Sequence, residues 1–158
     1  LWRCRKMTKD EFEVLHEICR KEWLTMAKTG STKHTSLVKP FMHSCPACEI
    51  ARATMLANQP YEEATHKCVF CPVWVWRELD AQLGCTMDGQ PYAQWFDITD
   101  ELDFMQEEEG SEERNIDLQE ELKGLARQIA NLGWSWMKEY REVELSEKAN
   151  QAIKDFRG

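Results

Sequence analysis

Four cysteines arranged in two close pairs constrain this chain more than any other feature of its sequence. Cys45 and Cys48 form the first pair, Cys68 and Cys71 form the second, and 19 residues separate the pairs. Two intervening residues allow both thiolates of a pair to reach one tetrahedral ion, and this separation is typical of zinc sites with four cysteine ligands. We therefore predict one zinc ion bound by these four residues.

The predicted zinc is structural, because four thiolates leave no open coordination position for hydrolysis at the metal. We expect the ion to hold residues 41–85 together, since this segment has too few apolar side chains to fold alone. His43, His66 and Cys85 are alternative ligands, each in place of one cysteine. Disulfides, unligated thiols or a redox-active dithiol are the alternatives to a metal.

Cysteine usage also indicates a compartment. Close Cys pairs in a reducing cytosol bind metal more often than they form disulfides, so we expect a cytoplasmic protein whose Cys4, Cys19 and Cys85 are thiols. No apolar run approaches the roughly 18 residues of a membrane span, and residues 1–6 lack the apolar stretch of a signal peptide. We therefore expect no membrane association.

The acidic charge of the chain is concentrated in one segment. The net charge is −8, yet residues 97–121 contain 12 Asp and Glu with a single basic residue, whereas residues 1–40 contain nine Lys and Arg against five acids. An acidic run repels a nucleic-acid backbone and attracts a basic protein surface. The alternative interpretation is a solvated acidic helix and linker. The predicted partner-binding acids are Asp100, Glu101, Asp103, Glu107, Glu108, Glu109, Glu112 and Glu113.

Capping residues and apolar spacing predict a mainly α-helical protein. Thr8 and Glu11 match a capping box, apolar residues then recur every three or four positions, and Gly30 matches a left-handed stop. We expect a helix over residues 9–28. No run is typical of a strand, although the cysteine pairs are compatible with a small hairpin.

Helix-start residues mark the rest of the chain. Proline suits the first turn of a helix, so Pro46 and Pro72 predict two helices, which we expect to end near positions 58 and 84. Three further helices are expected over residues 91–96, from Thr99 through the acidic run, and from Ser146 onward.

A heptad-like stripe of apolar residues runs from Leu118 to Val143 and predicts a long C-terminal helix or a helical hairpin. The stripe packs inside the chain or, alternatively, joins two copies in a homodimer. Trp134 and Trp136 are two positions apart and therefore do not face one seam. We expect Trp134 to lie at a partner interface or to cover the zinc module.

The chain divides by composition into three regions. Residues 1–40 contain the first helix and a loop, residues 41–96 contain the four-Cys zinc module with short helices, and residues 97–158 contain the acidic segment and the C-terminal helices. We therefore predict a helical protein with a small zinc module inserted after its first helix.

The cysteine pattern and its surroundings resemble a group of small phage-encoded Cys-rich proteins with paired C-x2-C motifs. The resemblance covers residues 11–96 and is carried by Leu15, His16, Trp23, Cys45, Cys48, Cys68, Cys71, Pro72, Gly84, Cys85, Pro91 and Tyr92. It implies a phage origin, and hence action in a bacterial host cell, but no particular chemistry.

The sequence lacks the motifs that would indicate an enzyme. It has no Gly-rich phosphate loop, no His-Glu-x-x-His and no deaminase pairing of His-x-Glu with Pro-Cys-x-x-Cys. We predict a non-enzymatic module that binds a host protein or nucleoprotein complex. Together with the resemblance, the acidic run favours a phage-encoded inhibitor of a bacterial nucleic-acid-handling or defence complex, such as a CRISPR complex, acting as a mimic of nucleic acid. The alternative is a zinc-containing nucleic-acid-binding module that uses basic N-terminal residues such as Lys28, Lys33 and Lys39.

Overall fold

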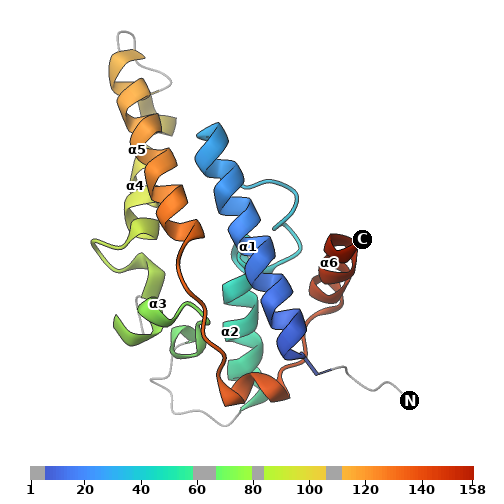
Figure 1. Ribbon diagram of the computed structural model, residues 1–158. Coiled ribbons are helices and arrows are strands. Elements are labelled where there is room, and N and C mark those ends of the chain that lie inside the picture. Colours follow the sequence, from blue (N-terminus) through green and yellow to red (C-terminus); the bar gives the residue numbers. More distant parts are fainter. Residues whose placement is uncertain (1–5, 59–66, 80–83, 106–111) are drawn as a thin grey trace.

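The computed structural model describes residues 6–58, 67–79, 84–105 and 112–158 of the protein. Within these ranges the protein is mainly α-helical, as predicted (Figure 1). The described part contains no strand, and its β pairing is limited to two isolated bridges, Lys6 with Glu144 and Val73 with Trp134. With η denoting a 3-10 helix, the elements are α1 (Lys9–Thr29), η1 (Met42–Ser44), α2 (Pro46–Ala57), η2 (Lys67–Phe70), α3 (Trp74–Leu79), η3 (Gly84–Thr86), α4 (Pro91–Met105), α5 (Glu112–Ala130), η4 (Lys138–Glu142) and α6 (Glu147–Arg157).

Helix α1 begins and ends as its capping residues predict. The Thr8 hydroxyl accepts a hydrogen bond from the Glu11 amide at 3.1 Å, and the Glu11 carboxylate accepts one from the Thr8 amide at 3.0 Å. At the other end Gly30 adopts φ +69°, and its amide donates to the carbonyl of Met26. A left-handed residue of this kind is accessible to glycine without steric cost, so the predicted stop is confirmed.

The other helices are arranged around α1. In Figure 1, α4 and α5 run antiparallel on one side of α1, and α6 lies on the opposite side. Contacts join α1 to α2, α5 and α6, and α5 to α4. The central position of α1 makes it the element that both halves of the core share.

Two groups of buried side chains form the core. The first lies between α1, α4, α5 and the cysteine segments and includes Trp23, Trp76 and Leu122. The second lies between α1, α2, η4 and α6 and includes Leu15 and Tyr140. Each group draws on residues from all three regions predicted from composition. The cysteine segments are therefore packed into the helical body.

Helix α4 corrects one prediction from the sequence. Two short helices with a break before Thr99 were expected, whereas one helix spans Pro91–Met105. Thr99 lies inside it, and its hydroxyl donates to the carbonyl of Phe96 at 2.7 Å, which satisfies the hydroxyl without ending the helix. Trp95, Ile98 and Leu102 form one continuous buried face across the expected break. Tertiary packing of this face outweighs the local capping preference.

The stripe from Leu118 to Val143 is not one helix, so the predicted continuation beyond α5 is wrong. Helix α5 ends at Ala130 and the chain leaves it near Gly133, where a Cβ atom would lie 3.1 Å from Nε1 of Trp74. The next residues run back along the cysteine segments, and the Ser135 amide donates to the carbonyl of Pro72 at 2.9 Å. The close packing of the Gly133 backbone on Trp74 therefore accompanies the end of the helix.

The apolar side chains of this stripe are used inside the protein. Leu122, Leu125 and Ile129 are buried in the first core group, and Tyr140 and Val143 are fully buried in the second. Side chains in these positions are not accessible to a second copy. These five side chains therefore contribute to core packing inside the protein, the first of the two alternatives expected for the stripe.

Tyr140 connects the second core group to the cysteine segments. Its side chain is fully buried, and its hydroxyl donates to the carbonyl of Phe70 at 2.7 Å. The substitution Tyr140→Phe is expected to lower the free energy of unfolding by about 1–2 kcal/mol, because the variant keeps the ring but loses a buried hydrogen bond. Urea unfolding followed by circular dichroism measures this change, and an unaltered midpoint would contradict it.

Candidate metal centre and interaction surface

The fold brings the two cysteine pairs onto neighbouring elements. Cys45 is the N-cap of α2 and Cys48 lies in the first turn of that helix, whereas Cys68 lies in η2 and Cys71 directly follows it. Helix α2 packs against η2. Cys85 lies in η3, which packs against α3, and α3 in turn packs against η2. Five cysteines that are distant in sequence therefore occupy one region of the fold.

A small enclosed cavity of about 60 Å³ lies in this region. Three of these five residues line it, Cys45, Cys48 and Cys85, as does Cys19 of α1, and Trp76 and Tyr92 form part of its wall. Burial and, to a smaller extent, the charges of the same three cysteines together raise the pKa of Tyr92 to about 12. The Tyr92 hydroxyl therefore shares one poorly solvated space with these thiols.

The Cys71 thiol is buried, so its ionised form requires a neutralising partner. Burial raises the pKa of its thiol well above the ordinary range, while the Val73 amide donates a hydrogen bond to the sulfur and lowers it. The charges of Cys48, Cys85 and Cys68 raise the pKa again. Several thiolates this close repel one another unless a cation neutralises them, so the cluster is chemically suited to a metal ion.

The structure brings the predicted ligands into one region, but not close enough together to coordinate one ion. Within the described ranges, no group of three or more Cys, His, Asp or Glu side chains is close enough together to hold a metal, and the six described cysteines are thiols. Each thiol changes position by rotation about one side-chain bond. Soft thiolates in C-x2-C pairs fit zinc by donor type. His43 lines the cavity, and His66 lies outside the described residues.

The chain enters the first cysteine pair through a strained turn. His43 and Ser44 both have φ +53°, in the left-handed region that non-glycine residues rarely occupy. The Cys45 amide then donates to the carbonyl of Met42 at 3.0 Å. Strain of this kind persists only where the surroundings fix the backbone, and here it directs Cys45 toward the cavity.

A buried carboxylate, which the sequence analysis did not single out, holds the loop beside the cavity. Glu22 on α1 is only 1% exposed, and its carboxylate contacts Nδ1 of His34 at 3.0 Å and accepts from the Thr35 amide at 2.8 Å. The Thr35 hydroxyl also donates to it. The sequence does contain a signal, because Glu22 follows Leu15 and Ile18 on the apolar face of α1.

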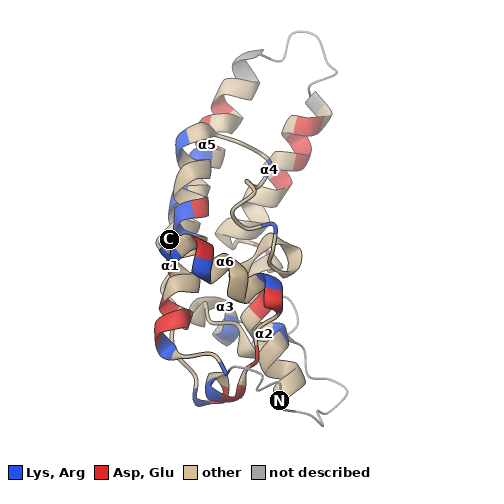
Figure 2. Ribbon diagram, turned by 90° about the vertical axis from the view of Figure 1, so that its right-hand side faces the viewer, with Lys and Arg blue, Asp and Glu red and all other residues tan. Residues whose placement is uncertain are grey.

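The structure describes only part of the predicted acidic surface. Asp100 and Asp103 are exposed on α4, together with Asp97, and Glu101 is partly exposed beside them. Figure 2 shows this acidic colouring along α4, with none of the basic colour on that helix. Glu107, Glu108 and Glu109 lie outside the described residues, and the side chains of Glu112 and Glu113 at the start of α5 are also outside them.

Exposed apolar side chains accompany the acids, and the sequence analysis missed them. Phe96 is 50% exposed and Phe104 is 72% exposed, both on α4, and Ile116 on α5 is 62% exposed. Phe96, Asp100 and Phe104 recur every four residues, so they share one side of the helix. This spacing predicts the shared face from the sequence only if α4 is taken as one continuous helix.

Trp134 is not brought together with these acids. Its ring stacks on the imidazole of His16 at a centroid distance of 4.7 Å and lies 5.6 Å from the ring of Phe12. It forms an isolated bridge with Val73 and also lines the cavity beside the cysteines. Of the two roles predicted for Trp134, the one next to the cysteine segments matches its position.

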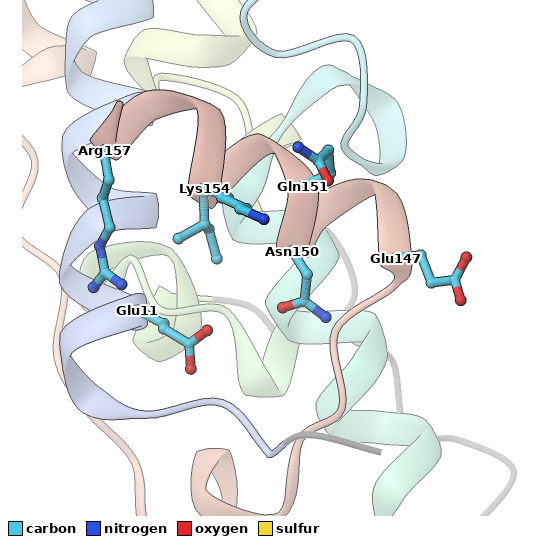
Figure 3. A pocket seen from close by; sticks show the side chains of 7 residues that line it. Glu11, Glu147, Asn150, Gln151, Lys154 and Arg157 are labelled. Atoms are coloured by element: carbon cyan, nitrogen blue, oxygen red, sulfur yellow. The ribbon is translucent and has the colours of Figure 1, made fainter. Parts of the chain in front are cut away.

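A larger open groove between α6 and the start of α1 has a volume of about 600 Å³ (Figure 3). Several of its polar side chains bond within the protein. Glu11 caps α1, Arg157 pairs with Asp10, and Asn150 donates to the carbonyl of Leu145 at 3.3 Å. We therefore interpret the groove as a polar seam between two helices.

Comparisons with known proteins give no relative from which to transfer a function. Searches against protein-family models, curated proteins and solved structures found no match. No helix in the described ranges is both long enough and apolar enough to cross a membrane. Function must therefore be inferred from the cysteine region and the α4 surface themselves.

Proposed function

We propose that this protein binds a basic surface of a partner protein through the exposed side of α4, without catalysing a reaction. The observation that carries the proposal is the exposure of Phe96 and Phe104 among Asp97, Asp100 and Asp103. Isolated exposed apolar residues are ordinary, but two aromatic rings on one acidic helix face have the composition of an interface. Aromatic anchors supply most of the energy at such interfaces, and surrounding charges supply specificity and association rate.

Helix geometry supports a basic partner. A rise of 1.5 Å per residue puts Phe96 and Phe104 about 12 Å apart along the axis, with the carboxylates between and beside them. Residues 97–121 carry 12 acids, so the field around this surface is negative. A protein that normally binds nucleic acid offers the matching surface. The proposed partner is therefore a nucleic-acid-handling or defence complex of a bacterial host, with this chain as a phage-encoded inhibitor.

We further propose that a zinc ion bound by the cysteines stabilises the body that presents α4. The packing of α2 against η2, the buried Cys71 and the cavity lined by Cys45 and Cys48 support this role. Trp95 of α4 belongs to the same core group as Cys71. A metal ion that fixes the cysteine segments would therefore also fix the position of α4. With four thiolate ligands the ion has a structural function.

The α4 surface is tested with two variants as baits in nuclease-treated bacterial lysate. One carries Phe96→Ala and Phe104→Ala, the other carries Asp100→Lys and Asp103→Lys, and Glu17→Lys on the exposed face of α1 is the control. We expect a protein that the wild type and the control both capture, that added duplex DNA displaces, and that both α4 variants bind at least about 10-fold more weakly. Charge reversal should also reduce the salt dependence of binding.

Two results would overturn the α4 proposal. The first is equal recovery of the same protein by the wild type and both α4 variants. The second is recovery of nucleic acid from a parallel lysate without nuclease, where the recovery is lost on nuclease treatment and on charge reversal of Lys28, Lys33 and Lys39, which are exposed in the N-terminal region. That outcome would favour a nucleic-acid-binding module.

A further inference from the structure

We propose that Cys85 is a fifth thiolate of the metal centre and competes with Cys45 for one of the four positions around the zinc ion. This inference rests on the zinc site proposed above and names its ligands more closely. The two C-x2-C pairs alone would supply a complete set of four. The position of Cys85 in the fold adds a donor that the sequence pattern does not require.

The turn that carries Cys85 is built against the second cysteine pair. Gly84 is buried and adopts φ +50°, and a Cβ atom on it would lie 2.9 Å from Sγ of Cys68 and 3.2 Å from its Cβ. Real Cβ atoms do not approach other atoms so closely, so only glycine allows the backbone to pass this sulfur. The next residue in the chain is Cys85. Its backbone is therefore anchored beside Cys68.

Cys85 also shares a cavity with the first cysteine pair. It lines the enclosed cavity together with Cys45 and Cys48, and all three share this wall with Tyr92. Cys85 thus lies between the pairs, with the preceding residue against Cys68 and Cys85 itself lining the cavity that Cys45 and Cys48 also line. Cys45, at the N-cap of α2, and Cys85, in η3, approach that space from different elements.

Zinc chemistry makes such competition feasible. Zn²⁺ has no geometric preference from its d electrons and takes four ligands in structural sites, so thiolates of similar position exchange on it. The fifth sulfur remains a thiol and carries its proton while the other four bind as thiolates. Loss of either Cys45 or Cys85 should therefore leave four sulfur ligands, whereas loss of both leaves three.

Cobalt substitution and zinc competition test this redundancy in the full-length protein. The variants are Cys45→Ser, Cys85→Ser and the double substitution, all with Cys4→Ser so that the thiols compared are those of the described fold. Cys19→Ser is the control for loss of a buried thiol that lines the same cavity, because the Cys19 sulfur on α1 already accepts from the Trp23 side chain. Thiolate-to-cobalt absorption reports the number of sulfur ligands, and a chromogenic chelator reports zinc affinity.

We expect both single variants to keep the four-thiolate absorption of the wild type and to weaken zinc binding by no more than about 10–100-fold. The double variant should lose one thiolate from the spectrum and weaken zinc binding by more than that. If Cys45→Ser alone loses a thiolate while Cys85→Ser changes nothing, the inference about Cys85 is wrong and the four-Cys site stands. If the wild type shows no thiolate-to-cobalt absorption, the zinc site itself is wrong.

Alkylation of the zinc-loaded protein gives a second readout. It keeps Cys45 and Cys85 intact, so it does not depend on whether a cysteine variant folds. Brief reaction with N-ethylmaleimide, followed by peptide mass spectrometry, should divide the label between Cys45 and Cys85 on different molecules and leave Cys48, Cys68 and Cys71 protected. Complete labelling of Cys85 with full protection of Cys45 would overturn the proposal.

Discussion

Removal of the proposed zinc ion is expected to lower the melting temperature of the protein by roughly 8–16 °C. A ligand that binds only the folded state stabilises it by about 4 kcal/mol at a concentration 1,000 times its Kd. In a domain of this length, 1 kcal/mol corresponds to roughly 2–4 °C. The effect should reach the whole protein, because Cys71 shares a core group with Trp23 of α1 and Leu122 of α5.

Circular dichroism melts in excess zinc and after chelation measure this shift, with magnesium as the control ion. A variant with Ser at all five clustered cysteines should melt at the same temperature under both conditions, which separates the metal effect from any effect of the chelator. Equal melting temperatures for the wild type with and without zinc would show that the cysteine cluster is not a structural metal site. Proteolysis of the chelated protein should begin between α2 and η3.

Helix ends set by local capping were predictable from the sequence. The capping box at Thr8 and the left-handed Gly30 bound α1 as expected, and the Ser146 hydroxyl accepts from the Ala149 amide at 3.1 Å to start α6. In each case the residues that decide the end of the helix lie within one turn of it. No information about the rest of the fold is needed to read them.

Elements decided by tertiary packing were not predictable in the same way. Thr99 resembles a helix start, yet burial of Trp95 and Leu102 on one face carries α4 through it. The apolar stripe beyond Ala130 keeps helical spacing, yet the backbone at Gly133 packs against Trp74. Spacing identifies which residues will be buried, but it does not say which partner buries them.

The candidate sites also combine features that local sequence predicts with features that depend on tertiary packing. The two cysteine pairs are visible as a short pattern, whereas the place of Cys85 depends on the contact between Gly84 and Cys68. The exposure of Phe96 becomes meaningful only after α5 has covered the other face of α4. Sequence reasoning therefore identified the two cysteine pairs, and the fold showed which other residues lie beside them.

The substitution Glu22→Ala is expected to lower the free energy of unfolding by about 3 kcal/mol. The carboxylate is almost fully buried and is the common partner of His34 and Thr35, so its removal leaves the Thr35 amide without this acceptor. Glu22→Gln is the matched control, since its amide oxygen can accept from His34 and Thr35 and its amide nitrogen can donate to the Thr35 hydroxyl. We expect it to cost about 1 kcal/mol.

The same carboxylate should make stability depend on pH. Burial raises the pKa of Glu22, but hydrogen bonds from His34 and Thr35 outweigh that effect and hold the pKa below its ordinary value. A carboxyl group whose pKa is lower in the folded state stabilises the protein fully above the unfolded pKa of about 4.3. That stabilisation is lost as pH falls through the folded pKa.

Urea unfolding between pH 3 and pH 6 separates charge from packing at this position. Wild-type stability should fall more steeply below about pH 4.3 than that of Glu22→Gln, because the variant has no carboxylate to protonate at this site. The stabilities of the two proteins should therefore converge at the acidic end of the range. Parallel curves across the whole range would mean that the loop bearing His34 and Thr35 is held by packing against Trp23 and Trp95 rather than by the charge of Glu22.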